Sequence, residues 1–253
     1  MSLISLAEKN NLPSLQLMDK ETLGWIKSNK PNFSSGLAIN KYSRAIKTNL
    51  LRFSPPDSWF QEKNHISSLH GRRHILRVIA NASYLAQENK ISSCHLINKL
   101  LVAASLHDLR RKNDKGDPGH GQRVVEWLSL NKSKVCKQFH LNFDEKDFID
   151  IKSAILLHEA PYDQFDKKFA YAYDTKKIID LLKSADALDR YRLPKIKWWI
   201  NDKYLALSPS DDAKKFAYEL VLESESNFLK TKKNLPSVLS ALNLLEKKYG
   251  SKQ

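Results

Sequence analysis

The sequence predicts an all-α fold, and three observations favour it. Glycine is scarce, with 7 residues in 253, whereas β-rich folds usually need more glycines at their turns. Beyond residue 64, apolar residues recur at helical spacing along most of the chain. The segment 95–111 (HLINKLLVAASLHDLRR) is apolar on nearly all sides, which is typical of a helix buried in the middle of a protein. We therefore expect a bundle of about eight to ten helices.

The first 60 residues predict a separate N-terminal extension, because prolines divide them into short pieces (Pro13, Pro31, Pro55 and Pro56). Helices are expected near 19–29 and 37–52, and the Pro55-Pro56 pair ends this part. In the core, apolar spacing predicts helices at 64–89, 95–111 and 145–158. Another helix should start at Asp117-Pro118, with Asp as N-cap and Pro at the first helical position. A further helix at 176–190 can be capped by Thr175.

After Pro194 the pattern predicts three more helices, near 195–206, 210–230 and 236–249, the last ending at Gly250. We therefore divide the chain into an extension at 1–60, a core at 61–192 and C-terminal helices at 193–253. At this length, one elaborated domain is a better expectation than two full ones.

Composition narrows the class of protein. No apolar run approaches the roughly 18 residues of a membrane span, and no signal peptide is predicted at the N-terminus. Two cysteines, Cys94 and Cys136, without a CxxC motif predict neither a disulfide framework nor a thiolate zinc site. We expect a soluble, cytoplasmic protein. The formal charge of +14 should attract anionic ligands such as nucleotides, other phosphates or nucleic acid, although a lysine-rich solvated surface explains it equally well.

Polar residues on the apolar helices are the candidates for chemistry. His70 and His74 lie four apart, hence on one helix face. Each later core helix contributes an imidazole or a carboxylate where hydrophobic patterning expects the interior or a cleft (His107, Asp108, His120, His158 and Asp186). A buried aspartate is costly unless a cation or hydrogen bonds compensate it. One such histidine alone is more often an ordinary core residue, but several converging groups indicate a metal site.

These segments resemble the HD-domain metal-dependent phosphohydrolases. The resemblance covers residues 66–192 and depends on HGRRHILRV at 70–78, SLHDLRR at 105–111, GHG at 119–121, LLHE at 156–159 and KSADALDRYR at 183–192. It implies a helical bundle in which His74, the doublet His107-Asp108, and Asp186 bind a metal. Members with two metals add two histidines, and His120 and His158 stand where those are expected. A dinuclear site bridged by Asp108 is then preferred over a mononuclear one.

Two neighbouring residues have alternative interpretations. His70 is expected just outside the direct metal ligands. Asp189 is either a hydrogen-bond partner of a ligand or an exposed acid, and Glu159 is more readily explained as a solvated acid than as a ligand.

Imidazole and carboxylate ligands select a divalent ion such as Mn, Fe, Co, Ni, Zn or Mg, one or two per chain. Such an ion lowers the pKa of a bound water from about 16 towards 7. We therefore expect a catalytic group of Asp108 and His107 with Arg110 and Arg111, whose guanidinium groups can bind phosphate. The two arginines are equally well explained as an ordinary basic helix end.

The other substrate-binding candidates follow from position. Arg73 and Arg77 lie on the His74 helix, Asn113 and Asp114 lie in a polar loop between two ligand-bearing helices, and Arg190 follows Asp186.

The leading functional prediction is hydrolysis of a small phosphorylated substrate, most simply a nucleotide or cyclic nucleotide. The alternative is an HD-type nuclease acting on single-stranded nucleic acid, which the charge favours modestly. The aromatics of KIKWWINDKY (Trp198, Trp199 and Tyr204) could stack on bases, although core packing is the more usual role of such residues. A third alternative, a silent nucleotide-binding regulator, predicts a broken ligand set, whereas every ligand that the resemblance implies is present.

Overall fold

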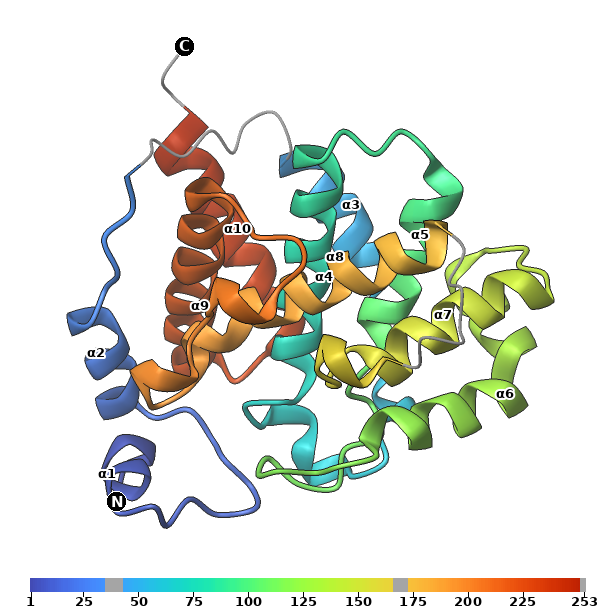
Figure 1. Cartoon of the computed structure of the whole chain (residues 1–253). Helices are drawn as coiled ribbons and strands as arrows, with labels where there is room; N and C mark the ends of the chain where they lie inside the picture. Colours follow the sequence, from blue (N-terminus) through green and yellow to red (C-terminus); the bar gives the residue numbers. More distant parts are fainter. Residues whose placement is uncertain (35–42, 166–172, 251–253) are drawn as a thin grey trace.

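The computed structural model describes residues 1–34, 43–165 and 173–250 and confirms the all-α prediction, since these residues form helices and no β-strand (Figure 1). The α-helices are α1 (Leu3–Glu8), α2 (Lys20–Ser28), α3 (Ser43–Arg52), α4 (Arg72–Glu88), α5 (Cys94–Leu106), α6 (His120–Phe139), α7 (Glu145–Leu157), α8 (Tyr173–Leu188), α9 (Asp211–Thr231) and α10 (Asn234–Gly250). Short 3₁₀ turns connect several of them (Asp57–Trp59, Lys63–Ser67, Tyr162–Gln164, Asp189–Arg192, Ile196–Trp198 and Asp202–Tyr204). No described helix has both the length and the apolar character needed to cross a membrane.

Helix α4 forms the centre of the bundle. It packs against α3, α5, α8, α9 and α10, and its residues 73–86 are all buried. Helices α6 and α7 pack against each other on one side, and α9 and α10 form a second pair on the other side (Figure 1). As expected, α5 is buried along its whole second half. This arrangement lets side chains from α4, α5 and α8 meet deep inside the protein.

Local capping explains where several of these helices begin. The hydroxyl of Ser93 accepts a hydrogen bond from the Leu96 amide at the start of α5, and Ser210 does the same for Ala213 at the start of α9. A reciprocal capping box joins Asp144 and Asp147 at the start of α7.

Three predicted elements were wrong in detail. Residues 195–206 do not form one α-helix but two 3₁₀ turns, because Trp199 leaves the helical path and packs into the core through contacts with Trp25 and Tyr191. Thr175 lies inside α8 instead of capping it, and its hydroxyl donates to Asp150. The helix expected at Asp117-Pro118 begins at His120.

Two further differences concern the N-terminal half. The helix expected at 64–89 is a 3₁₀ turn, Lys63–Ser67, followed by α4. The first part of the helix expected at 37–52 lies outside the described residues, and the rest is α3.

One hydrophobic cluster contains residues from all three predicted segments. Ile46 and Phe53 from the first 60 residues, Leu76 and Leu182 from the middle, and Phe216 from the C-terminal part all belong to it. The C-terminal helices therefore pack directly on the core, and the division at residues 60 and 192 stays a prediction about the chain's organisation.

Candidate metal centre

The six predicted metal ligands come from five elements and lie close together in the structure. His74 is on α4 and Asp186 is on α8. His107 and Asp108 follow the end of α5, His120 opens α6, and His158 follows the end of α7. Side chains placed at helix ends can converge from different directions, so the bundle gathers a ligand set that no single helix could present.

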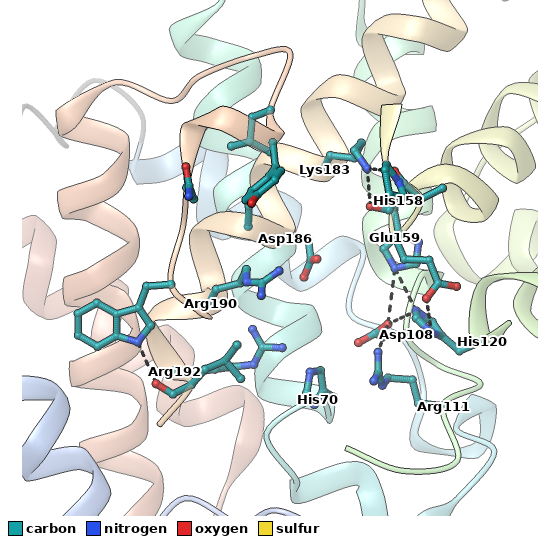
Figure 2. A pocket seen from close by; sticks show the side chains of 18 of the residues that line it. His70, Asp108, Arg111, His120, His158, Glu159, Lys183, Asp186, Arg190 and Arg192 are labelled. Carbon is teal, nitrogen blue, oxygen red and sulfur yellow. Dashed lines mark hydrogen bonds and ion pairs between the residues drawn. The ribbon is translucent and has the colours of Figure 1, made fainter. Parts of the chain in front are cut away.

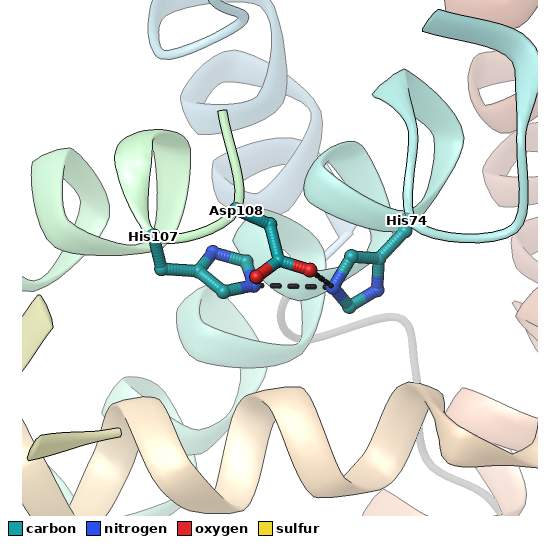
Figure 3. A group of neighbouring side chains, drawn as sticks. All are labelled: His74, His107 and Asp108. Atoms are coloured by element: carbon teal, nitrogen blue, oxygen red, sulfur yellow. Dashed lines mark hydrogen bonds and ion pairs between the residues drawn. The ribbon is translucent and has the colours of Figure 1, made fainter. Parts of the chain in front are cut away.

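The first group contains His74, His107 and Asp108, all of them buried (Figure 3). The Nε2 atoms of His74 and His107 are 3.1 Å apart, and Oδ2 of Asp108 lies 3.3 Å from His74 Nε2. Asp186 Oδ1 adds a fourth donor at 3.4 Å from His74 Nε2 and 3.9 Å from His107 Nε2. Ligands bound to one ion at about 2.1 Å lie about 3.0–3.4 Å apart, so this spacing suits a metal.

The second group contains Asp108, His120 and His158 and shares its carboxylate with the first. The carboxylate oxygen of Asp108 that belongs to this group is Oδ1, which lies 2.9 Å from His120 Nε2 and 3.8 Å from His158 Nε2. The two imidazole Nε2 atoms are 3.1 Å apart. Each group could hold a divalent metal ion, with one oxygen of Asp108 facing each.

The protonation of the four imidazoles supports this interpretation. Each Nδ1 lies within hydrogen-bond distance of an oxygen that only accepts: Asp189 Oδ2 at 2.7 Å, Ala104 O at 2.8 Å, Asp117 O at 2.9 Å and Ile155 O at 2.6 Å. When a ring with this hydrogen bond is neutral, its proton lies on Nδ1 and its Nε2 presents a lone pair. Lone pairs at 3.1 Å repel unless a proton or a cation lies between them.

The carboxylates strengthen the need for a cation. Oδ1 of Asp108 is buried and accepts no hydrogen bond from the described residues. Burial opposes ionisation of Asp108, but the guanidinium group of Arg111 holds its pKa well below the usual range. Burial also lowers the pKa of His107 to about 3. A neutral imidazole beside an ionised carboxylate is the protonation state in which both bind metal.

The GHG segment places His120. Gly119 has a φ of 78°, in the left-handed region that favours glycine, and it is the residue from which α6 begins. A Cβ on Gly121 would lie 2.8 Å from the carbonyl oxygen of Ile155, so a larger residue there would push α6 away from α7. The two glycines thus hold His120 against His158.

A chain of buried ion pairs holds the Nδ1 side of the His74 ring, away from the group of candidate metal ligands. Asp189, completely buried, accepts from His74 Nδ1 and from Arg77 Nε at 2.6 Å, so it is the hydrogen-bond partner of a predicted ligand and not an exposed acid. Arg77 in turn contacts Glu225 Oε1 on α9 at 2.6 Å. Burial opposes ionisation of Asp189, but Arg77 and Arg192 lower its pKa to about 2. Sequence reasoning missed Glu225, because nothing in a helical pattern marks one glutamate of α9 as buried.

An open cavity of about 450 Å³ adjoins the two groups of candidate metal ligands (Figure 2). Asp108, His120, His158 and Asp186 line it. Five cationic side chains also line it: Arg111, Lys183, Arg190, Arg192 and Lys197. This charge suits an anionic ligand that contacts the metal-binding residues.

Among the predicted phosphate-binding residues, Arg111 and Arg190 line this cavity. Arg111 Nη1 is 3.5 Å from Asp108 Oδ1. Arg110 is not among the lining residues and donates to the carbonyl of Trp59.

Arg73 and Arg77 are buried on the side of α4 that faces α9, where they pair with Glu225, so their positions do not support a substrate contact. Asn113 accepts from the Lys115 amide within its own loop. Asp114 is buried and anchors the N-terminal segment and His70.

Sequence reasoning missed Lys183 and Arg192. Lys183 lies three residues before Asp186 on α8, and this spacing could have indicated that both side chains lie on the same helix face. Its Nζ donates to the carbonyls of His158 at 3.0 Å and Ala160 at 2.6 Å, which fixes the end of α7. Glu159 Oε2 lies 3.2 Å from His120 Nδ1 at the cavity rim.

Comparisons with family models, curated proteins and solved structures found no match to this chain. The residues and their geometry alone support the functional proposal.

Asp189→Asn is expected to weaken metal binding by about 10- to 100-fold, because a neutral amide oxygen accepts from Nδ1 of His74 more weakly than a carboxylate and orients the ring less firmly. The measurement is the dissociation constant of Mn²⁺ for the chelator-treated protein. Asp57→Asn is the matched control, since it also removes a carboxylate paired with an arginine, but at an exposed site. Equal affinities in the two variants would contradict the positioning role.

Proposed function

We propose that this chain is a metal-dependent phosphohydrolase that cleaves a phosphate ester or phosphodiester of a nucleotide-type substrate. One observation carries the proposal: two groups of imidazole and carboxylate donors share Asp108, and they adjoin a cavity lined by five cations. Paired divalent ions beside a cationic cavity are a common arrangement for phosphoryl chemistry. The HD-domain resemblance agrees with this ligand order.

The ligands fit two divalent ions. His74, His107 and Asp186 with Oδ2 of Asp108 would hold one, and His120 and His158 with Oδ1 of Asp108 would hold the other. The donor set of nitrogen and oxygen, without thiolate, suits Mn, Fe, Co, Ni, Zn or Mg. When bound, such ions act as Lewis acids and make water acidic enough to supply a nucleophile near neutral pH.

The chain's own residues orient and neutralise the substrate. Arg111, Arg192 and Lys183 all line the cavity, and Figure 2 shows Asp186 between Lys183 above and the two arginines below, so a phosphate beside Asp186 would have cations around it. Burial opposes the charge of Arg111, yet Asp108 and Asp117 raise its pKa, so it stays cationic. Hydrolysis adds a water oxygen to phosphorus, breaks the ester P–O bond and leaves one water proton on the released alcohol. Cations around the phosphate stabilise the charge that develops on its oxygens.

A nuclease is the second candidate. Tyr204 is 74 % exposed at the cavity rim, and Lys197 lines the same cavity. A single strand of nucleic acid could therefore contact both side chains.

The experiment is a substrate panel with the Mn²⁺-loaded protein, consisting of nucleotides, cyclic nucleotides, single-stranded DNA and single-stranded RNA. Released phosphate, monoester products and fragment length are the readouts. Hydrolysis of nucleotides alone supports the proposal, and cleavage of a strand favours the nuclease. A metal-loaded protein that hydrolyses none of these would overturn both.

A further inference from the structure

A second cavity of about 460 Å³ lies beside the first. The two share three lining residues, His70, Arg190 and Leu193, so the second cavity starts where the cationic cavity ends. None of the metal ligands lines it. The three shared side chains mark the boundary between the two cavities, so a ligand bound in the first lies next to the second.

The N-terminal segment, which lies outside the HD-domain resemblance, forms one wall of this cavity through Asn10, Leu12 and Gln16. Asp114 holds that wall in place. Its Oδ2 accepts from the Gln16 amide at 2.7 Å, and its own amide donates to the Ser14 carbonyl at 2.6 Å. The same carboxylate accepts from Ser68 Oγ at 2.8 Å, so one buried side chain joins the N-terminal wall to the entrance of α4.

The opposite wall comes from the segment after α8. Trp198 is partly buried and lines the cavity together with Leu193. Lys195 joins the two walls, because its Nζ donates to Asn10 Oδ1 at 2.6 Å and lies 4.9 Å from the centre of the Trp198 ring. Both walls are thus fixed by specific contacts, which is a property of a preformed binding site.

The lining combines an apolar surface with cations. Leu12, Leu193 and Trp198 offer the apolar contacts, and Arg190, Lys115 and Lys195 supply positive charge. A planar ring with hydrogen-bond acceptors suits such a site, since its faces pack on the apolar side chains and its edges meet donors. Each cavity alone has the volume of a small-molecule site.

We infer that the second cavity binds the base of a nucleotide whose phosphate lies at the metal centre, with Leu12, Leu193 and Trp198 as its contacts. The inference rests on the proposed function, which supplies the position of the phosphate. It assigns substrate selectivity to the N-terminal segment and to the segment after α8, and it distinguishes nucleotides from sugar phosphates of similar charge.

The test compares kcat/KM for nucleoside 5′-monophosphates with kcat/KM for ribose 5-phosphate, which lacks the base. The wild-type ratio should favour the nucleotide, and Trp198→Ala and Leu12→Ala should each lower that ratio about 5-fold or more. Trp198→Phe should restore most of it, because an aromatic face is retained. Leu130→Ala is the control, since Leu130 is 88 % exposed on α6 and should leave the ratio unchanged.

Calorimetric binding of the same nucleotides and of ribose 5-phosphate separates the inference from the proposed function. If nothing is hydrolysed but nucleotides bind more tightly than ribose 5-phosphate, and Trp198→Ala removes the difference, the base site stands and the proposed activity fails. Ratios and affinities that are the same in the wild type, Trp198→Ala and Leu12→Ala would overturn the inference.

Discussion

Asp108→Asn is expected to abolish both metal binding and hydrolysis. Asparagine keeps the size of the side chain but loses the charge, and its amide nitrogen cannot replace the second oxygen that faces the other group of ligands. The other five predicted ligands would then converge without the carboxylate common to both groups. We expect kcat/KM to fall by at least about 10³-fold, the scale on which loss of transition-state charge stabilisation is felt.

The matched control is Asp150→Asn. Asp150 is also buried, but it pairs with Lys99 at 2.6 Å on the side of α7 that faces α5, away from the cavity. That variant should keep its metal and its activity per folded molecule, even where its stability falls. An Asp108→Asn protein that retains wild-type metal content would remove the basis for a shared ligand.

Glu225→Ala is expected to lower the free energy of unfolding by about 3–5 kcal/mol, because it leaves two buried guanidinium groups short of their counter-ion. Glu225 lies 2.9 Å from Arg73 Nη2 and 2.6 Å from Arg77 Nη1, and all three side chains are buried. For a chain of this size, the melting temperature should fall by roughly 6–20 °C. Thermal and denaturant unfolding measure both quantities.

Glu246→Ala is the control for this prediction. Glu246 pairs with Lys47, but its side chain is 41 % exposed, so its loss should cost about 1 kcal/mol or less. The same small cost for Glu225→Ala would show that the buried ion pairs do not support the helix pair α4 and α9. Metal affinity measured on the folded fraction would then show whether the chain through Arg77 and Asp189 still orients His74.

The sequence predicted which histidine and aspartate side chains meet in the interior, because such residues are costly to bury on otherwise apolar helices. His74 is buried on α4, and its Nε2 lies 3.4 Å from Asp186 Oδ1 of α8. The chemistry of single residues at single positions was enough to predict which side chains meet.

Interactions that depend on tertiary packing could not be predicted in the same way. Arg73 and Arg77 looked available for phosphate until α9 placed Glu225 beside them. Asp114 looked like a loop residue at the rim, but it binds a segment about 100 positions earlier in the chain. Helical periodicity predicts which face of a helix points into the protein, but it does not predict which other helix packs against that face.

The segment 195–206 shows a third limit. Its apolar residues at helical spacing predicted a helix, but Trp199 packs on Trp25 and Tyr218 while Trp198 lines a cavity. Trp199 therefore has the core-packing role, whereas the ligand-contact role stays a prediction for Trp198. Only the tertiary structure distinguishes them.

The most direct test of the central claim is a count of the divalent ions that the chain binds. Purified protein is analysed for metal by mass spectrometry, treated with chelator, and then titrated with Mn²⁺ while bound and free ion are measured. We expect saturation at two ions per chain, together with a melting temperature that rises as the ion binds. A protein that contains no metal as purified and binds no Mn²⁺ in the titration would contradict it.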